Sequence, residues 1–176
     1  MAKNIAMVLA NNFEDIEATS PKEYLESQGA NVTVIGLDSN TIHGKKGATI
    51  EPDTTFDQLG KDGIDRFDAL VIPGGGSPEN LRIDRGAVDF TKRFFDTGKV
   101  VASICHGPQL LISAGVLNNR TTTSVNKIRD DFSNAGAHYV DEPVAVDGNL
   151  ISSRTPADLD MFNHAVAYAL GLTSEE

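Results

Sequence analysis

The chain has 176 residues, of which 40% are hydrophobic, and a formal net charge of −10 at pH 7. These values fit one globular domain over residues 1–176. They argue against nucleic acid or an anionic membrane as a partner, because both bind basic surfaces. No segment reaches the ~20 apolar residues of a membrane span, and the start reads as a strand rather than a signal peptide. A single cysteine excludes an internal disulfide and a multi-cysteine zinc site, so we expect a cytoplasmic protein.

Short β-branched segments alternate with amphipathic ones in the first half of the chain. In order, we predict a buried strand, a helix, a second strand, a small β excursion and a third buried strand, at residues 4–10, 15–29, 31–37, 43–52 and 67–76. Gly29 is a typical residue to follow a helix C-terminus. The third strand runs directly into three glycines.

The second half continues the same alternation. We predict a helix, a strand, two further helices, a hairpin and a terminal helix, at residues 86–98, 99–104, 107–115, 126–136, 143–154 and 155–171. Asp147-Gly148 suits a tight hairpin turn, and Thr155 followed by Pro156 suits a helix N-terminus. Alternating strands and helices predict an α/β fold, with a mostly parallel sheet covered by helices on both faces.

Cys105 follows the strand at 99–104 directly and is followed by His106, Gly107 and Pro108. Strand, small residue, x, nucleophile, x, glycine and helix is the order of a nucleophile elbow, although Ser103 stands where the strict motif has glycine. A helix start favours the thiolate, so we expect a lowered thiol pKa. The alternative is an inert, buried cysteine.

The glycines after the third strand belong to the same end of the predicted sheet. One helical crossover separates this strand from the one before Cys105, so we expect the two strands to be neighbours. Ligands bind at the carboxyl ends of such strands. The N–H groups of Gly74, Gly75 and His106 could together bind an oxyanion. A phosphate loop is the alternative, but "GGGSPENLR" lacks its spacing.

Acidic residues follow the first strand, at the same end of the sheet. Glu14, Asp15 and Glu17 are candidates for acid–base chemistry, and Glu79 occupies a similar helix start; all four could instead complement helix dipoles. The remaining histidines form no metal-binding pair, so we expect no metal site; they are His43, His138 and His164. No cofactor motif is found, and we expect no cofactor.

Four segments carry a resemblance to a known family. They are "FEDIE", "PGGGSPENLR", "ASICHGPQLLISAGVL" and "IRDDFSNAGAHYVDEPVAVDGNLISSRTPADL", which lie in order and cover nearly the full chain. With them the chain resembles the ThiJ/PfpI superfamily, and within it the PfpI-like intracellular cysteine hydrolases. The resemblance implies a flavodoxin-like three-layer sandwich with a nucleophile elbow.

The resemblance also implies roles for individual residues. Cys105 corresponds to the nucleophile, with His106 as its catalytic neighbour, and Glu17 to the acid that hydrogen-bonds the cysteine sulfur. Gly75 and the N–H of His106 correspond to the oxyanion hole. Glu79 corresponds to an acid that approaches the histidine from a neighbouring subunit. The resemblance therefore implies a homo-oligomer, either a dimer or a trimer of dimers.

These matches lead to one function hypothesis and two alternatives. The first is a stress-related enzyme that converts reactive dicarbonyls such as methylglyoxal without glutathione, with deglycation as a consequence. The second is a peptidase or amidase acting on short peptides; here the sequence departs from archaeal PfpI-like members, which carry a tyrosine where it has Val125. The third is a redox sensor or chaperone that uses Cys105 oxidation. A buried Glu17 would be protonated and could donate a hydrogen bond to the thiolate.

Overall fold

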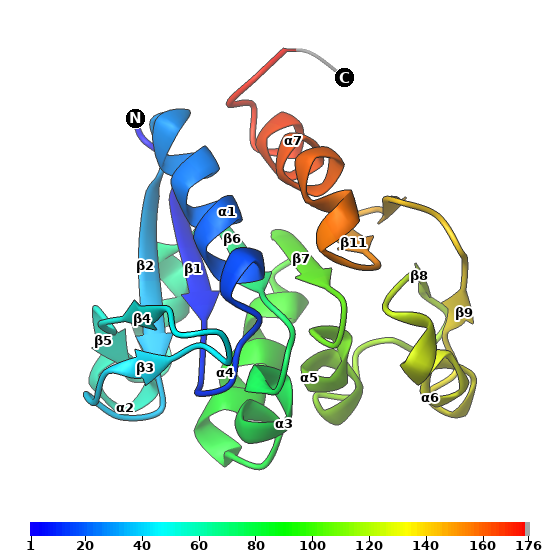
Figure 1. Ribbon diagram of the computed structural model, residues 1–176, viewed down its shortest axis with the longest axis horizontal. Coiled ribbons are helices and arrows are strands. Elements are labelled where there is room, and N and C mark those ends of the chain that lie inside the picture. The colour runs from blue at the N-terminus through cyan, green and yellow to red at the C-terminus, as the bar shows by residue number, and fades with distance from the viewer. Residues whose placement is uncertain (175–176) are drawn as a thin grey trace.

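A sheet of seven strands, in the order β10-β11-β7-β6-β1-β2-β5, forms the centre of the computed structural model, which describes residues 1–174 (Figure 1). Neighbouring strands are parallel except for the β10–β11 pair. The strands are β1 (Asn4–Val8), β2 (Asn31–Gly36), β5 (Thr54–Thr55), β6 (Ala69–Ile72), β7 (Val100–Ile104), β10 (Ala145–Asp147) and β11 (Leu150–Ser153).

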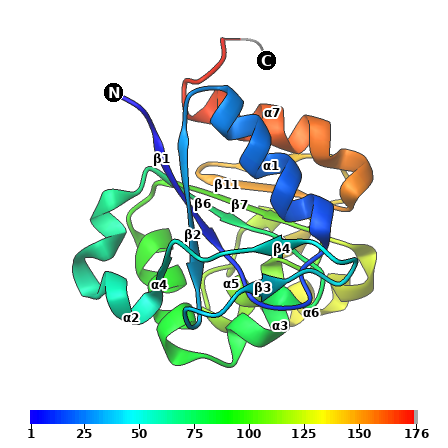
Figure 2. The same ribbon diagram turned by 60° about the vertical axis from the view of Figure 1, so that its left-hand side comes forward.

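Helices cover both faces of this sheet. Two of them, α1 (Asp15–Ser27) and α7 (Leu159–Ala169), lie side by side on one face, as Figure 2 shows. The second face packs against helices α2 (Phe56–Leu59), α3 (Ser77–Arg82), α4 (Arg85–Asp96), α5 (Pro108–Ser113) and α6 (Arg129–Asn134). Strand β1 explains the two layers, because Ile5 and Met7 pack toward α1 and α7 whereas Ala6 and Val8 pack into the other core.

Shorter strands and turns lie outside the seven-stranded sheet. Strands β3 (Ile42–His43) and β4 (Thr49–Ile50) form an antiparallel hairpin, and β8 (Thr121–Thr122) pairs in parallel with β9 (His138–Tyr139). Three 3-10 turns are η1 (Lys61–Arg66), η2 (Asn126–Ile128) and η3 (Pro156–Asp158). No helix within residues 1–174 is long and apolar enough to cross a membrane.

The predicted architecture is confirmed: the structure is an α/β sandwich with a mostly parallel central sheet. The strands β6 and β7 are parallel neighbours, with Ile72 opposite Ser103, as the short connection between them predicted. The crossover contains two helices, α3 and α4, rather than the single one that we expected. The β10–β11 hairpin is also confirmed.

Two helices are shorter in the structure than predicted. The segment 126–136 divides into η2 and α6, and the terminal helix divides into η3 and α7. Thr155 has extended backbone angles, but its side chain makes no capping hydrogen bond. Instead Asp158 accepts hydrogen bonds from the backbone N–H and the guanidinium of Arg154, at 3.1 and 2.9 Å. A nearby arginine therefore holds the helix start where a threonine was predicted to do so.

Candidate active site

Cys105 lies on a strained turn at the end of β7. Its φ of +60° is one of three positive values among the non-glycine residues of the described chain. This conformation costs an L-residue roughly 1–2 kcal/mol. The Cys105 N–H donates to the carbonyl of Ser153 at 3.1 Å, and the Cys105 carbonyl accepts from the N–H of Val125 at 3.2 Å. Two flanking segments thus hold the turn in place.

The glycine of the elbow is required by close packing. A Cβ added to Gly107 would lie 2.4 Å from the carbonyl oxygen of Ile72 and 2.9 Å from that of Ile104. Ser103, which replaces the first glycine of the strict motif, is fully buried within β7. The departure from the motif therefore falls on a strand position that accommodates a small side chain.

Glu17 lies in the first turn of α1 and is fully buried beside the elbow. Its Oε1 accepts a hydrogen bond from the N–H of Gly74 at 2.9 Å. Its Oε2 has no hydrogen-bond partner within the described residues. Burial raises the pKa of Glu17 to about 7, assisted by the negative charge of Glu14 and opposed by the bond from Gly74. A protonated form of Glu17 is therefore accessible near neutral pH.

The environment of the Cys105 thiol corrects one expectation. Burial, and after it the charge of Glu17, raises the pKa of Cys105 to about 12 instead of lowering it. The N–H groups of His106 and Gly75 face the sulfur and act in the opposite direction, but they do not outweigh burial. The loss of water around the thiol therefore decides the direction of the shift, against the amides of the helix start.

The thiol and the Glu17 carboxyl titrate as a pair, because each shifts the pKa of the other. Between the two pKa values the pair carries one proton. That proton can be on the sulfur or on the carboxyl. With the proton on the carboxyl, Glu17 can donate a hydrogen bond to the thiolate.

His106 completes the cluster from the residue after the cysteine. Its Nδ1 lies 3.5 Å from the Cys105 sulfur. Burial lowers the pKa of His106, while the charge of Glu79 acts against this change. Glu79 lies in α3 of the same chain and is exposed. Its approach to a histidine from a second subunit stays a prediction.

Sequence reasoning missed two lysines at this site. Glu14 is 6% exposed, and its two carboxylate oxygens lie 2.6 Å from the ammonium nitrogens of Lys45 and Lys46. Burial acts to raise the pKa of Glu14, but the two lysines lower it by more. The lysines come from the β3–β4 turn, which the sequence marked only as a small β excursion. Their partner is about thirty residues away, so no local pattern reveals the pairing.

Asp15 holds that turn against the start of α1. Its two carboxylate oxygens accept from the backbone N–H groups of Lys46 at 3.1 Å and Ala48 at 2.9 Å. Phe13 adds isolated β-bridges to Gly44 on one side and Gly75 on the other. In Figure 1 the loop between β1 and α1 accordingly runs alongside the β3–β4 hairpin.

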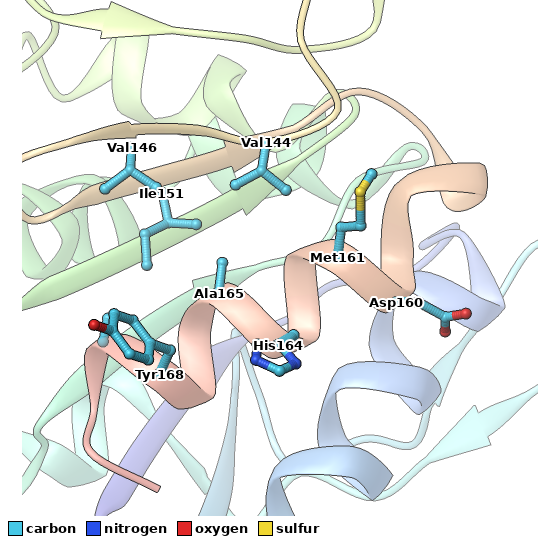
Figure 3. A pocket seen from close by; sticks show the side chains of 9 residues that line it. Val144, Val146, Ile151, Asp160, Met161, His164, Ala165 and Tyr168 are labelled. Atoms are coloured by element: carbon cyan, nitrogen blue, oxygen red, sulfur yellow. The ribbon is translucent and has the colours of Figure 1, made fainter. Parts of the chain in front are cut away.

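The other histidines lie elsewhere. His43 and His138 are exposed in short strands. His164 is half-buried in α7, beside a groove of about 740 Å³ between that helix and the β10–β11 hairpin. Figure 3 shows Val144 and Ile151 across this groove from Met161 and Ala165. Within residues 1–174, no group of three His, Cys, Asp or Glu side chains is placed to hold a metal ion.

Comparisons with known proteins agree with the observed fold. The family model described as the DJ-1/PfpI family matches residues 3–169. Deglycase PH1704 from Pyrococcus horikoshii is 48% identical over 155 residues, which are 88% of this chain and 92% of that protein. The structure of Drosophila melanogaster DJ-1beta superposes with a TM-score of 0.91 at 30% identity, covering 99% of this chain and 93% of that one.

A second solved structure has a different domain organisation. It is a two-domain protein from Anabaena variabilis that contains dj-1/thij/pfpi-like and ferritin-like domains. The superposition has a TM-score of 0.92 at 38% identity and covers 96% of this chain. The chain spans only 48% of that protein, about half of its length.

Proposed function

The chain belongs to the DJ-1/PfpI family, and on this premise we propose that it is a cysteine-dependent enzyme that converts small 2-oxoaldehydes into 2-hydroxy acids without glutathione. One observation carries the proposal: an elbow cysteine lies between a buried acid that titrates near pH 7 and two backbone N–H groups. The name of the relative PH1704, a deglycase, supports an activity on sugar-derived or dicarbonyl adducts.

The reaction begins with the shared proton of Cys105 and Glu17. When the proton is on the carboxyl, the thiolate attacks the aldehyde carbon and forms a C–S bond. The aldehyde oxygen becomes an alkoxide, which the N–H groups of Gly75 and His106 are placed to stabilise. The alkoxide takes up a proton, and the product is a hemithioacetal.

The second step moves hydrogen between neighbouring carbons. Glu17 or His106 removes the C1 hydrogen as a proton, and C2 receives a proton through an enediol intermediate. C1 is thereby oxidised to a thioester and C2 is reduced to an alcohol, so no external oxidant is needed. Water then cleaves the C–S bond, which releases the 2-hydroxy acid and regenerates the thiol.

Deglycation follows from the same chemistry. Hemithioacetals and hemiaminals of methylglyoxal form reversibly on protein groups, so removal of the free aldehyde also removes these adducts. No separate site for a protein substrate is required. A site that acts only on the free aldehyde thereby accounts for a deglycase activity.

The direct test uses the wild-type protein with methylglyoxal and no glutathione. Protein alkylated with iodoacetamide provides the background, because Cys105 is the only cysteine in the sequence. We expect one lactate for each methylglyoxal consumed, over many turnovers. Loss of methylglyoxal without lactate, or equal lactate from the alkylated protein, would contradict the proposal; release of amines from short peptides alone would favour the peptidase alternative.

The role of Glu17 predicts the pH dependence. The fully protonated pair must lose one proton before a thiolate can form, so wild-type kcat/KM should rise through about pH 7. In Glu17→Gln that proton cannot be taken up by the side chain, so the rise should move to higher pH. A shift of the inflection from pH 7 to pH 8 already lowers activity at pH 7 about fivefold. The measurement is kcat/KM for methylglyoxal from pH 5 to 10.

Glu23→Gln provides the matched control for this profile. Glu23 is an exposed residue of the same helix, α1, so its loss removes a carboxylate without changing the buried pair. We expect it to retain the wild-type inflection. An unchanged profile in Glu17→Gln would show that this carboxyl does not control the thiol.

A further inference from the structure

Lys45 is held in a fixed position relative to the reactive thiol. Its backbone N–H donates to the carbonyl of Phe13 at 3.0 Å. Phe13 is bridged in turn to Gly75, whose N–H faces the Cys105 sulfur. The neighbouring residue, Glu14, donates its N–H to the carbonyl of Gly74 at 3.3 Å. The turn that carries Lys45 is therefore connected by direct backbone contacts to the loop that lines the site.

The ion pair with Glu14 leaves part of the hydrogen-bonding capacity of the Lys45 ammonium unoccupied. The ammonium nitrogen lies 2.6 Å from Glu14 Oε2, and the Lys45 side chain is 47% exposed. An ammonium has three N–H donors, and within residues 1–174 the Lys45 ammonium has no second acceptor. Glu14 also pairs with Lys46, so two ammonium groups surround one carboxylate. Asp15, bound to the backbone of the same turn, supplies the second negative charge of this cluster.

Within residues 1–174, the other nearby acidic groups form no ion pair with the Lys45 ammonium, which keeps its remaining N–H donors. Both oxygens of Asp15 accept from backbone N–H groups of the turn. Glu79 is exposed on α3 and acts on His106. Among the two lysines on Glu14, Lys45 is the one whose charge acts on Cys105, Glu17 and His106. A positive charge therefore adjoins the reacting atoms of a protein whose net charge is −10.

We propose that Lys45 binds a carboxylate on the substrate, so that the preferred substrates are 2-oxoaldehydes that also carry a carboxylate group. This inference rests on the proposed function and narrows its substrate class. The two remaining N–H donors of the ammonium form charge-assisted hydrogen bonds to the carboxylate. Methylglyoxal, which is neutral, leaves them unused.

The atoms of this reaction balance as in the general case. With OHC–CO–CH2–CH2–COO⁻, addition of one water gives ⁻OOC–CHOH–CH2–CH2–COO⁻ and one proton. C1 is oxidised, C2 is reduced, and the distal carboxylate does not react. Its only role is to hold the reactive carbonyl groups over Cys105. A reaction that generates such oxoaldehydes must supply the substrate, and the product is a 2-hydroxy dicarboxylate.

The test compares 4,5-dioxovalerate, the compound written above, with methylglyoxal. The quantity measured is the ratio of kcat/KM for the two, in wild type, Lys45→Gln, Lys45→Arg and Lys46→Gln. One charge-assisted hydrogen bond is worth about tenfold or more, so we expect wild type to favour the anionic compound by about that factor. Lys45→Gln should lose the preference, and Lys45→Arg should retain most of it.

Lys46→Gln is the matched control, because it removes a lysine from the same carboxylate. The Lys46 side chain is 66% exposed, and we expect the ratio to change by less than about threefold. The wild-type preference should also weaken as ionic strength rises.

The outcomes separate the two proposals. A ratio equal in wild type and Lys45→Gln, with methylglyoxal still converted, overturns the carboxylate site and leaves the proposed function intact. A larger loss in Lys46→Gln than in Lys45→Gln also overturns it. If wild type converts neither compound above the alkylated background, both proposals fail.

Discussion

Replacement of Cys105 by alanine is expected to lower kcat/KM for methylglyoxal by on the order of 10³-fold or more, because no other group can form the C–S bond. The chain has no second cysteine to substitute for it. The fold should be little affected. Alanine keeps the same backbone at φ +60°, so the free energy of unfolding should change by less than about 1 kcal/mol.

Cys105→Ser tests whether the reaction requires the sulfur itself or only a side chain of the same shape. Serine keeps nearly the same shape, but its hydroxyl is a far weaker acid than a thiol, and Glu17 is not basic enough to ionise it. Both variants should be inactive and equally stable in urea unfolding. Retention of a tenth of the wild-type activity in the serine variant would show that sulfur does not form the covalent intermediate.

Gly75→Ala should lower the free energy of unfolding by roughly 3 kcal/mol or more, from left-handed backbone strain together with overpacking. Gly75 has a φ of +72°, and a Cβ added there would lie 2.3 Å from the N of Glu14 and 2.8 Å from the O of Asn12. Both atoms belong to the backbone and cannot move aside cheaply. Activity should fall as well, because the Gly75 N–H that faces the sulfur would shift.

Gly98→Ala is the control that separates backbone strain from steric overlap of the added Cβ. Gly98 has a similar φ of +78°, but a Cβ there would have no heavy atom within 4 Å. Only the backbone cost of about 1–2 kcal/mol applies, and activity should be unchanged. Urea unfolding of both variants measures the difference. Equal destabilisation would mean that the loops around Gly75 adjust to an extra methyl group.

Local pattern accounts for the parts of this protein that were predicted correctly. The fully buried strands β1 and β6 are continuous apolar runs, and the hairpin is marked by its turn residues. Strands β3 and β4 fall in the predicted β excursion, whereas β8 and β9 escaped prediction because two residues carry no periodicity. Strand β5 and helix α2 follow directly on one another and were missed for the same reason.

The turn at Cys105 was predicted from local pattern, whereas the electrostatics around it were not. The order of residues around Cys105 and Gly107 marked the elbow, because a sharp strand-to-helix turn demands those residue types in consecutive positions. The direction of the thiol pKa was wrong, since it depends on how much water the fold removes. Lys45 was missed because its partner, Glu14, lies in a distant segment.

The sequence by itself therefore determined the layered α/β fold and the strained turn at Cys105, since each is encoded by residues close together in the chain. Only the tertiary structure decided that Glu17 and Cys105 each shift the pKa of the other, and that the charge of Lys45 acts on both. These properties arise from burial and from distances between segments. Folding creates both, and neither can be read from neighbouring residues.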